Sequence, residues 1–177
     1  GPVSSADMPA APFQLMDQNG RPVSLASLRG KAAVITFLDP VCTTDCPVIA
    51  REMSQADTFL GGDATRVELV AINANPRYTS AEYIEAFDRQ EQLQSVPNWS
   101  FLTGSPAQLQ QVWRAWGIDV QYGTGGAMII HSEVAYVVDP SGRVRTVIST
   151  DPGPATSSTT SSFAQLFAQA ARQVLTP

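Results

Sequence analysis

The two cysteines of this chain, Cys42 and Cys46, are separated by three residues and carry its only thiols. They follow an apolar run over 32–38 that predicts a buried strand, and Pro47 comes directly after them, where a helix can begin because proline suits the first turn. Unpaired N–H groups and the helix dipole at such a position favour the thiolate, which attacks disulfides and binds soft metals. The pair therefore predicts thiol exchange or metal binding rather than two inert core cysteines.

His131 is the only histidine of the chain and follows a glycine-rich run over 122–126. Its position at the start of a predicted strand is compatible with an ordinary hydrogen-bonded histidine. It also allows contact with the cysteines, because open α/β sheets bind ligands at the carboxyl ends of their strands. Two thiolates and one imidazole suit low-coordinate copper. Structural zinc takes four protein ligands, and Asp45, which shares the loop with both cysteines, is poorly placed to complete a tetrahedron.

The composition excludes some classes of function. The chain has 177 residues, of which 44% are hydrophobic, and this length is enough for one domain with a substantial core. Eleven basic and sixteen acidic residues give a net charge of −5, so nothing favours a nucleic-acid partner. No apolar run reaches the roughly 20 residues of a membrane helix. The first residues, Gly1-Pro2, resemble the remnant of a removed tag, so we expect a native N-terminal segment with a membrane tether to be missing.

The remaining pattern predicts one α/β domain over 13–177, preceded by a flexible arm over 1–12 that combines tag remnant and linker. Residues 13–25 predict an N-terminal β-hairpin, because Asn19-Gly20 is a typical hairpin turn. Strands alternate with helices and are followed by a second hairpin and a last helix, which indicates a central mixed sheet flanked by helices. The further strands are predicted over 66–72, 99–102, 133–138 and 143–148, and the helices over 47–60, 81–92, 106–116 and 163–174.

The chain resembles the Sco/SenC family of thioredoxin-fold copper proteins over about Phe13 to Val174. The resemblance is carried by FQLMDQNG from Phe13, LRGK from Leu28, CTTDCP from Cys42, LTG from Leu102, and HS at His131 followed by YVVDPSG from Tyr136. The chain departs from the family pattern at three positions. Thr43 stands where many members have proline, Ile130 replaces an acidic residue before the histidine, and Asn75 replaces aspartate before a proline.

This resemblance implies a thioredoxin-like fold and a copper site formed by Cys42, Cys46 and His131. It implies a metallochaperone that binds Cu(I) or Cu(II) and delivers copper to subunit II of cytochrome c oxidase. Another periplasmic copper chaperone would be a second partner. It also implies a domain outside the cytoplasm, anchored to the membrane or to lipid in the full-length protein.

Other functions of the same residues stay open. The first alternative is a thiol–disulfide oxidoreductase that reduces partner cysteines with Cys42 and Cys46 and needs no metal, so the sequence leaves open whether the chain is an enzyme. A peroxidase of the peroxiredoxin class is a weaker alternative, because Pro40 to Cys46 is one residue short of the motif of that class. Asp45 is either a residue that supports the site or recognises a partner, or an acid that complements the helix dipole.

Overall fold

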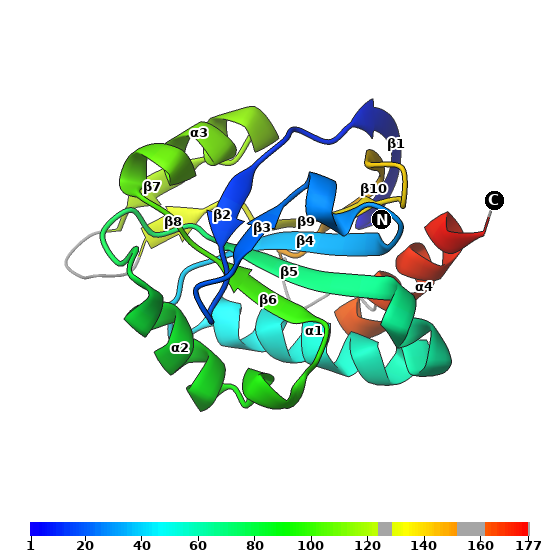
Figure 1. Cartoon of the computed structure of the whole chain (residues 1–177), viewed down its shortest axis with the longest axis horizontal. Helices are drawn as coiled ribbons and strands as arrows, with labels where there is room; N and C mark the ends of the chain where they lie inside the picture. Colours follow the sequence, from blue (N-terminus) through cyan, green and yellow to red (C-terminus); the bar gives the residue numbers. More distant parts are fainter. Residues whose placement is uncertain (124–128, 152–161, 177) are drawn as a thin grey trace.

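The computed structural model describes residues 1–123, 129–151 and 162–176. Six strands form its central sheet: β1 Val3–Pro9, β4 Ala32–Leu38, β5 Val67–Asn73, β6 Trp99–Leu102, β9 Val134–Val138 and β10 Arg143–Ser149. Their order is β1-β10-β9-β4-β5-β6 (Figure 1). The pairs β4–β5 and β5–β6 are parallel, whereas β1, β10, β9 and β4 pair antiparallel. The predicted mixed α/β sheet is therefore confirmed.

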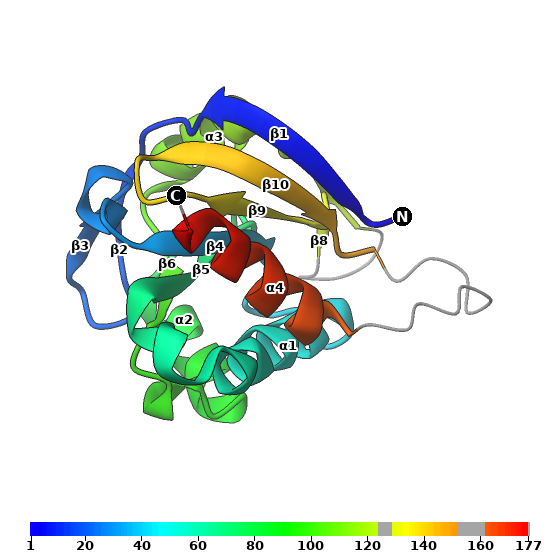
Figure 2. The ribbon, with the colours of Figure 1, turned by 90° about the vertical axis from the view of Figure 1, so that its right-hand side faces the viewer.

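Helices cover both faces of this sheet. Helices α1 (Asp45–Leu60), α2 (Ala81–Gln90) and α4 (Phe163–Leu175) lie on one face, and α3 (Pro106–Trp116) lies on the other (Figure 2). Short 3₁₀ turns cover Ala26–Leu28, Gly61–Arg66 and Leu93–Ser95. None of the described helices combines the length and the hydropathy that a bilayer-spanning segment needs.

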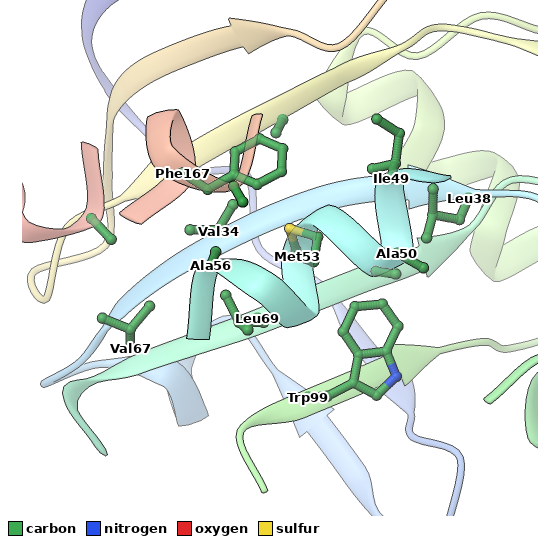
Figure 3. Packing of buried hydrophobic residues seen from close by; sticks show 14 of the residues in the cluster. Val34, Leu38, Ile49, Ala50, Met53, Ala56, Val67, Leu69, Trp99 and Phe167 are labelled. Atoms are coloured by element: carbon green, nitrogen blue, oxygen red, sulfur yellow. The ribbon is translucent and has the colours of Figure 1, made fainter. Parts of the chain in front are cut away.

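Strand β4 lies inside the sheet, between β9 and β5, and this position explains why its sequence is a continuous apolar run. All seven of its residues are buried. Val34 and Leu38 belong to the core shared with α1, α2 and α4 (Figure 3), and Ile35 and Phe37 belong to the core shared with α3. Because successive side chains of a strand point to opposite faces, a strand covered on both faces must be apolar throughout. This central strand fixes the place where the cysteine loop begins.

The predicted N-terminal hairpin is confirmed. It consists of β2 (Gln14–Met16) and β3 (Pro22–Ser24), paired antiparallel. The Asp17 side chain accepts hydrogen bonds from the backbone N–H groups of Asn19 and Arg21, at 2.8 and 2.9 Å, and Gly20 has the positive φ that this turn requires.

The prediction of a flexible arm over 1–12 is wrong for most of that segment. Strand β1 pairs with β10 at the edge of the sheet, with Val3 opposite Ile148 and Pro9 opposite Arg143. Six of the seven side chains of β1 are exposed. The strand is therefore held by backbone hydrogen bonds to β10, with an ion pair of Arg143 and Asp7 beside them. Such an edge strand has no apolar alternation that a sequence pattern could reveal.

A short hairpin that the sequence did not predict carries the histidine. It pairs β7 (Val120–Tyr122) with β8 (Ile129–His131), so His131 ends a strand of this hairpin instead of starting β9. The glycine-rich loop predicted over 122–126 and the loop predicted over 151–162 lie largely outside the described residues. The position of His131 is thus set by β8.

Candidate metal and thiol site

The loop after β4 places both cysteines. Helix α1 begins at Asp45, two residues earlier than predicted, so Cys46 lies in its first turn and Cys42 precedes it. Pro47 is tolerated there because the first four N–H groups of a helix have no partner within the helix. The Cys42 N–H donates to the Asp39 carbonyl oxygen at 3.1 Å, and the Asp39 N–H donates to Cys46 Sγ at 3.3 Å. Backbone groups at the end of β4 therefore hold both thiol-bearing residues.

The structure brings His131 to Cys46, although 85 positions separate them in the sequence. Cys46 Sγ lies 3.4 Å from His131 Nε2, and His131 Nδ1 lies 2.9 Å from the Ser132 carbonyl oxygen. A carbonyl oxygen can only accept a hydrogen bond, so Nδ1 carries the proton of the neutral ring. Nε2 therefore presents its lone pair to the thiol. Metal-binding histidines commonly have this arrangement, in which the other ring nitrogen donates to a carbonyl oxygen.

The two thiols differ in burial and in charge. Cys46 is buried and Cys42 is half-buried, and both are free. The neighbouring Cys46 thiol, helped by hydrogen bonds from Thr44, lowers the pKa of Cys42 to about 5. The same pairing with Cys42, together with burial, raises the pKa of Cys46 well above its usual range. At neutral pH the site thus holds one thiolate, at Cys42, and one thiol, at Cys46.

The three predicted ligands are not yet arranged around one point. Cys42 Sγ is directed to Thr44, at 3.4 Å from its Oγ1 and 3.5 Å from its backbone N. As the described side chains stand, no three histidine, cysteine or acidic residues among them are gathered to hold a metal ion. Cys46 and His131 are in contact, whereas Cys42 Sγ contacts Thr44 and pairs with the Cys46 thiol. The donor set itself, two sulfurs and one imidazole nitrogen, fits a soft monovalent ion.

The site opens into a hollow of about 620 Å³ with an acidic rim. Asp45, Glu133 and Asp151 line this hollow together with both cysteines and His131. Burial, together with the neighbouring Asp45 carboxyl, raises the pKa of Glu133 to about 7. The structure therefore places Asp45 in the first turn of α1 and beside Glu133.

The buried carboxylate of Asp39 was not predicted from the sequence. This side chain has no exposed surface. Its Oδ1 accepts hydrogen bonds from the Val41 N–H at 3.0 Å and from Asn75 Nδ2 at 2.9 Å, and its Oδ2 accepts one from the Ile129 N–H at 3.3 Å. The sequence does contain a signal for it, because Asp39 directly follows a fully apolar strand. A carboxylate in that position is buried only where hydrogen-bond donors surround it.

Comparison with known proteins agrees with this fold. A family model described as SCO1/SenC matches residues 3–164. The SCO1 protein homolog of Bacillus subtilis is 28% identical over 135 residues, which cover 75% of this chain and 69% of that protein.

Two solved structures resemble the chain along nearly its whole length. ScoI of Bradyrhizobium japonicum, solved with copper bound, has a TM-score of 0.76 at 24% identity and covers 94% of this chain and 99% of its own. BsSco, described as a member of the Sco family of cytochrome c oxidase assembly proteins with a disulfide switch, has a TM-score of 0.75 at 22% identity and covers 98% of each chain. These likenesses confirm the predicted thioredoxin-like fold.

Proposed function

Since this chain belongs to the SCO1/SenC family, we propose that it is a copper-binding metallochaperone whose cargo is held by Cys42, Cys46 and His131. One observation carries the proposal. Cys46 Sγ and His131 Nε2 lie 3.4 Å apart, and Nδ1 is committed to a carbonyl oxygen, so a lone pair and a sulfur already face each other. The copper bound in the similar ScoI of Bradyrhizobium japonicum supports the same cargo.

The chemistry of the donors divides their work. Thiolate sulfur selects Cu(I), so Cys42 and Cys46 supply most of its affinity. The imidazole of His131 is the harder donor and matters most for Cu(II). A partner thiolate that enters the acidic hollow can replace one ligand at a time and so take the ion without releasing it to water.

We propose subunit II of cytochrome c oxidase as the recipient, because the Sco family of BsSco is described as one of cytochrome c oxidase assembly proteins. The family resemblance also supports work outside the cytoplasm, by a full-length protein anchored to a membrane or to lipid. A second periplasmic copper chaperone would supply the ion. Transfer of copper from the loaded chain to a purified soluble domain of subunit II, followed by optical spectroscopy, tests this step.

Copper binding itself is tested by anaerobic titration of the reduced chain with Cu(I) against a competing chelator. We expect one tight equivalent, lost in Cys42→Ala and in Cys46→Ala and retained in His131→Ala with lower affinity. Ser149→Ala is the matched control, because Ser149 lines the same hollow without a soft donor. Weak binding that none of the three site variants changes would overturn the copper proposal.

The unequal thiols favour a second function, thiol–disulfide exchange, which makes the chain an oxidoreductase. The Cys42 thiolate would attack a partner disulfide and displace one partner thiolate, forming a mixed disulfide. Cys46, after losing its proton, would attack the Cys42 sulfur and release the second partner thiolate, so two electrons pass to the partner and a Cys42–Cys46 disulfide remains. Failure of the reduced chain to reduce a model disulfide such as cystine would rule out this activity.

A further inference from the structure

Asp39 touches each of the three segments that carry the predicted ligands. Its backbone carbonyl oxygen holds the Cys42 N–H, and its backbone N–H donates to Cys46 Sγ. Its carboxylate holds the N–H of Ile129, the first residue of β8 and two positions before His131. One fully buried residue therefore connects the cysteine loop, the first turn of α1 and the histidine strand.

The carboxylate of Asp39 links β8 to this loop, whereas other hydrogen bonds act within the β7–β8 hairpin. The Ser132 N–H donates to the Asp119 carbonyl oxygen at 3.1 Å, and the Asp119 N–H donates to Ser132 Oγ at 2.9 Å. These bonds fix β8 to the segment before β7 but not to the cysteines. The apolar side chain of Ile129 packs in the core shared with α3, and such packing does not fix the position of β8 along its own axis. The hydrogen bond to Asp39 Oδ2 fixes that position.

The carboxylate is itself held on its other side. Asn75, in the loop after β5, donates to Asp39 Oδ1, and the backbone N–H of Asn75 donates to Asn73 Oδ1 at 2.8 Å. Asn73 is fully buried and donates through Nδ2 to the carbonyl oxygen of Tyr78. The carboxylate is thus supported by the end of β5 and by the loop that follows it.

We propose that Asp39 is a positioning residue that sets the distance between Cys46 Sγ and His131 Nε2. It acts through His131 and does not bind the cargo. The inference rests on the proposed copper site for one of its readouts, and a second readout requires no metal.

Asp39→Asn tests the inference with nearly the same shape. If the amide oxygen keeps Val41 and Asn75, the amide NH₂ faces the N–H of Ile129, and two donors then oppose each other. We expect hydrogen exchange of the Ile129 amide to accelerate at least tenfold. Cu(II) affinity should fall about 10- to 100-fold, as it does when a group that orients a metal ligand is removed. Cu(I) affinity, which the thiolates dominate, should stay within about threefold.

A double-mutant cycle separates positioning from a general loss of stability. In the His131→Ala background, Asp39→Asn should lower Cu(II) affinity by no more than about twofold, because its effect passes through the missing imidazole. Asp17→Asn is the matched control, since Asp17 is also a buried turn carboxylate that accepts backbone N–H groups. It should leave the Ile129 exchange rate and both copper affinities unchanged.

Each outcome decides one of the two proposals. Unchanged Ile129 exchange in Asp39→Asn, or an equal loss of Cu(II) affinity with and without His131, would overturn the positioning role. If the unsubstituted chain binds no copper, the proposed function fails, and Ile129 exchange alone then decides the role of Asp39. If Asp39→Asn does not fold, Asn75→Ala removes one support of the carboxylate. It should give the same pattern at smaller amplitude, and the lack of any change there would contradict the inference.

Discussion

Two buried aspartates of this chain, Asp39 at the site and Asp88 in helix α2, have opposite surroundings. Their exposed fractions are 0% and 1%. Asp39 accepts hydrogen bonds from two backbone N–H groups and one amide through both of its oxygens. Asp88 accepts one, from Trp99 Nε1 at 3.0 Å, and within the described part of the chain its Oδ2 has no partner.

The difference shows what a buried carboxylate needs. Removing a charge from water is costly unless donors replace the water. At Asp39 the donors belong to three different segments, so the charge also ties those segments together. At Asp88 burial prevails over the single bond to Trp99 and raises the pKa of the carboxyl to about 7. The same residue type is therefore an anchor in one place and a source of pH sensitivity in the other.

The largest effect is expected from Asp39→Ala. It removes the acceptor of the Ile129 N–H, which is buried, and of the Val41 N–H, which is partly buried, and it takes one acceptor from the Asn75 amide. At about 1–3 kcal/mol for each unsatisfied group, partly relieved by water, the free energy of unfolding should fall by about 4 kcal/mol. Urea denaturation measures this loss. A loss below about 1 kcal/mol would mean that the three donors find other acceptors, and the contrast with Asp88 would then fail.

Asp88→Asn should change the pH dependence of stability. The folded carboxyl has a pKa of about 7 against the usual 3.8 of an aspartate, so between these values the folded state binds more protons than the unfolded state. The free energy of unfolding of the unsubstituted chain should therefore fall as the pH rises from about 4 to 7 and should change no further above that, whereas Asp88→Asn should lack this contribution. One pKa unit is about 1.4 kcal/mol, and with partial solvent screening we expect about 3 kcal/mol in all.

The test is to measure unfolding of both proteins at pH 4 and pH 8. Asp88→Asn should gain about 3 kcal/mol relative to the unsubstituted chain between these two pH values. Asp57→Asn serves as the control, because Asp57 lies in α1 on the same side of the sheet and accepts a hydrogen bond from Asn98 Nδ2. If the free energy of unfolding of Asp88→Asn, like that of Asp57→Asn, differs from that of the unsubstituted chain by the same amount at both pH values, Asp88 is charged in the folded protein. The contrast between Asp39 and Asp88 is then wrong.

Thr44→Val extends the comparison to a third charge, the Cys42 thiolate. Thr44 lowers the pKa of Cys42 from both its hydroxyl and its backbone N–H. The variant keeps the shape and removes the hydroxyl, so the pKa of Cys42 should rise from about 5 by up to about one unit. The ultraviolet absorbance of the thiolate follows the titration. Thr58→Val, an exposed substitution farther along α1, should leave it unchanged.

The smallest effect should come from an exposed charge. Asp7 pairs with Arg143 at 2.7 Å, but both side chains face solvent, which screens the pair. Asp7→Asn should leave the urea midpoint unchanged within error. A clear decrease would show that β1 depends on this pair rather than on its backbone ladder with β10.

Much of the fold could be predicted because its signals are local. Strand β4 is a continuous apolar run, the β2–β3 turn contains Asn19-Gly20, and α3 begins where Ser105 and Gln108 form a capping box. Strand β1 was missed because its side chains are exposed and only backbone pairing with β10 orders it. Its partner lies more than 130 positions away, which no local pattern reports.

The site could be predicted as a set of residues but not as an arrangement. The types and spacing of Cys42 and Cys46 indicate their chemistry, and the lone His131 is the natural third donor. Its contact with Cys46, however, depends on the β7–β8 hairpin and on the buried link from Asp39 to Ile129. That link joins residues 90 positions apart and exists only once the strands have paired.

X-ray absorption of the Cu(I)-loaded chain tests most directly whether Cys42, Cys46 and His131 act as one site. We predict two sulfur ligands and one nitrogen ligand around copper. The nitrogen should be lost in His131→Ala, and one sulfur should be lost in Cys42→Ser. A copper environment of nitrogen and oxygen alone, or one that neither variant changes, would contradict the account.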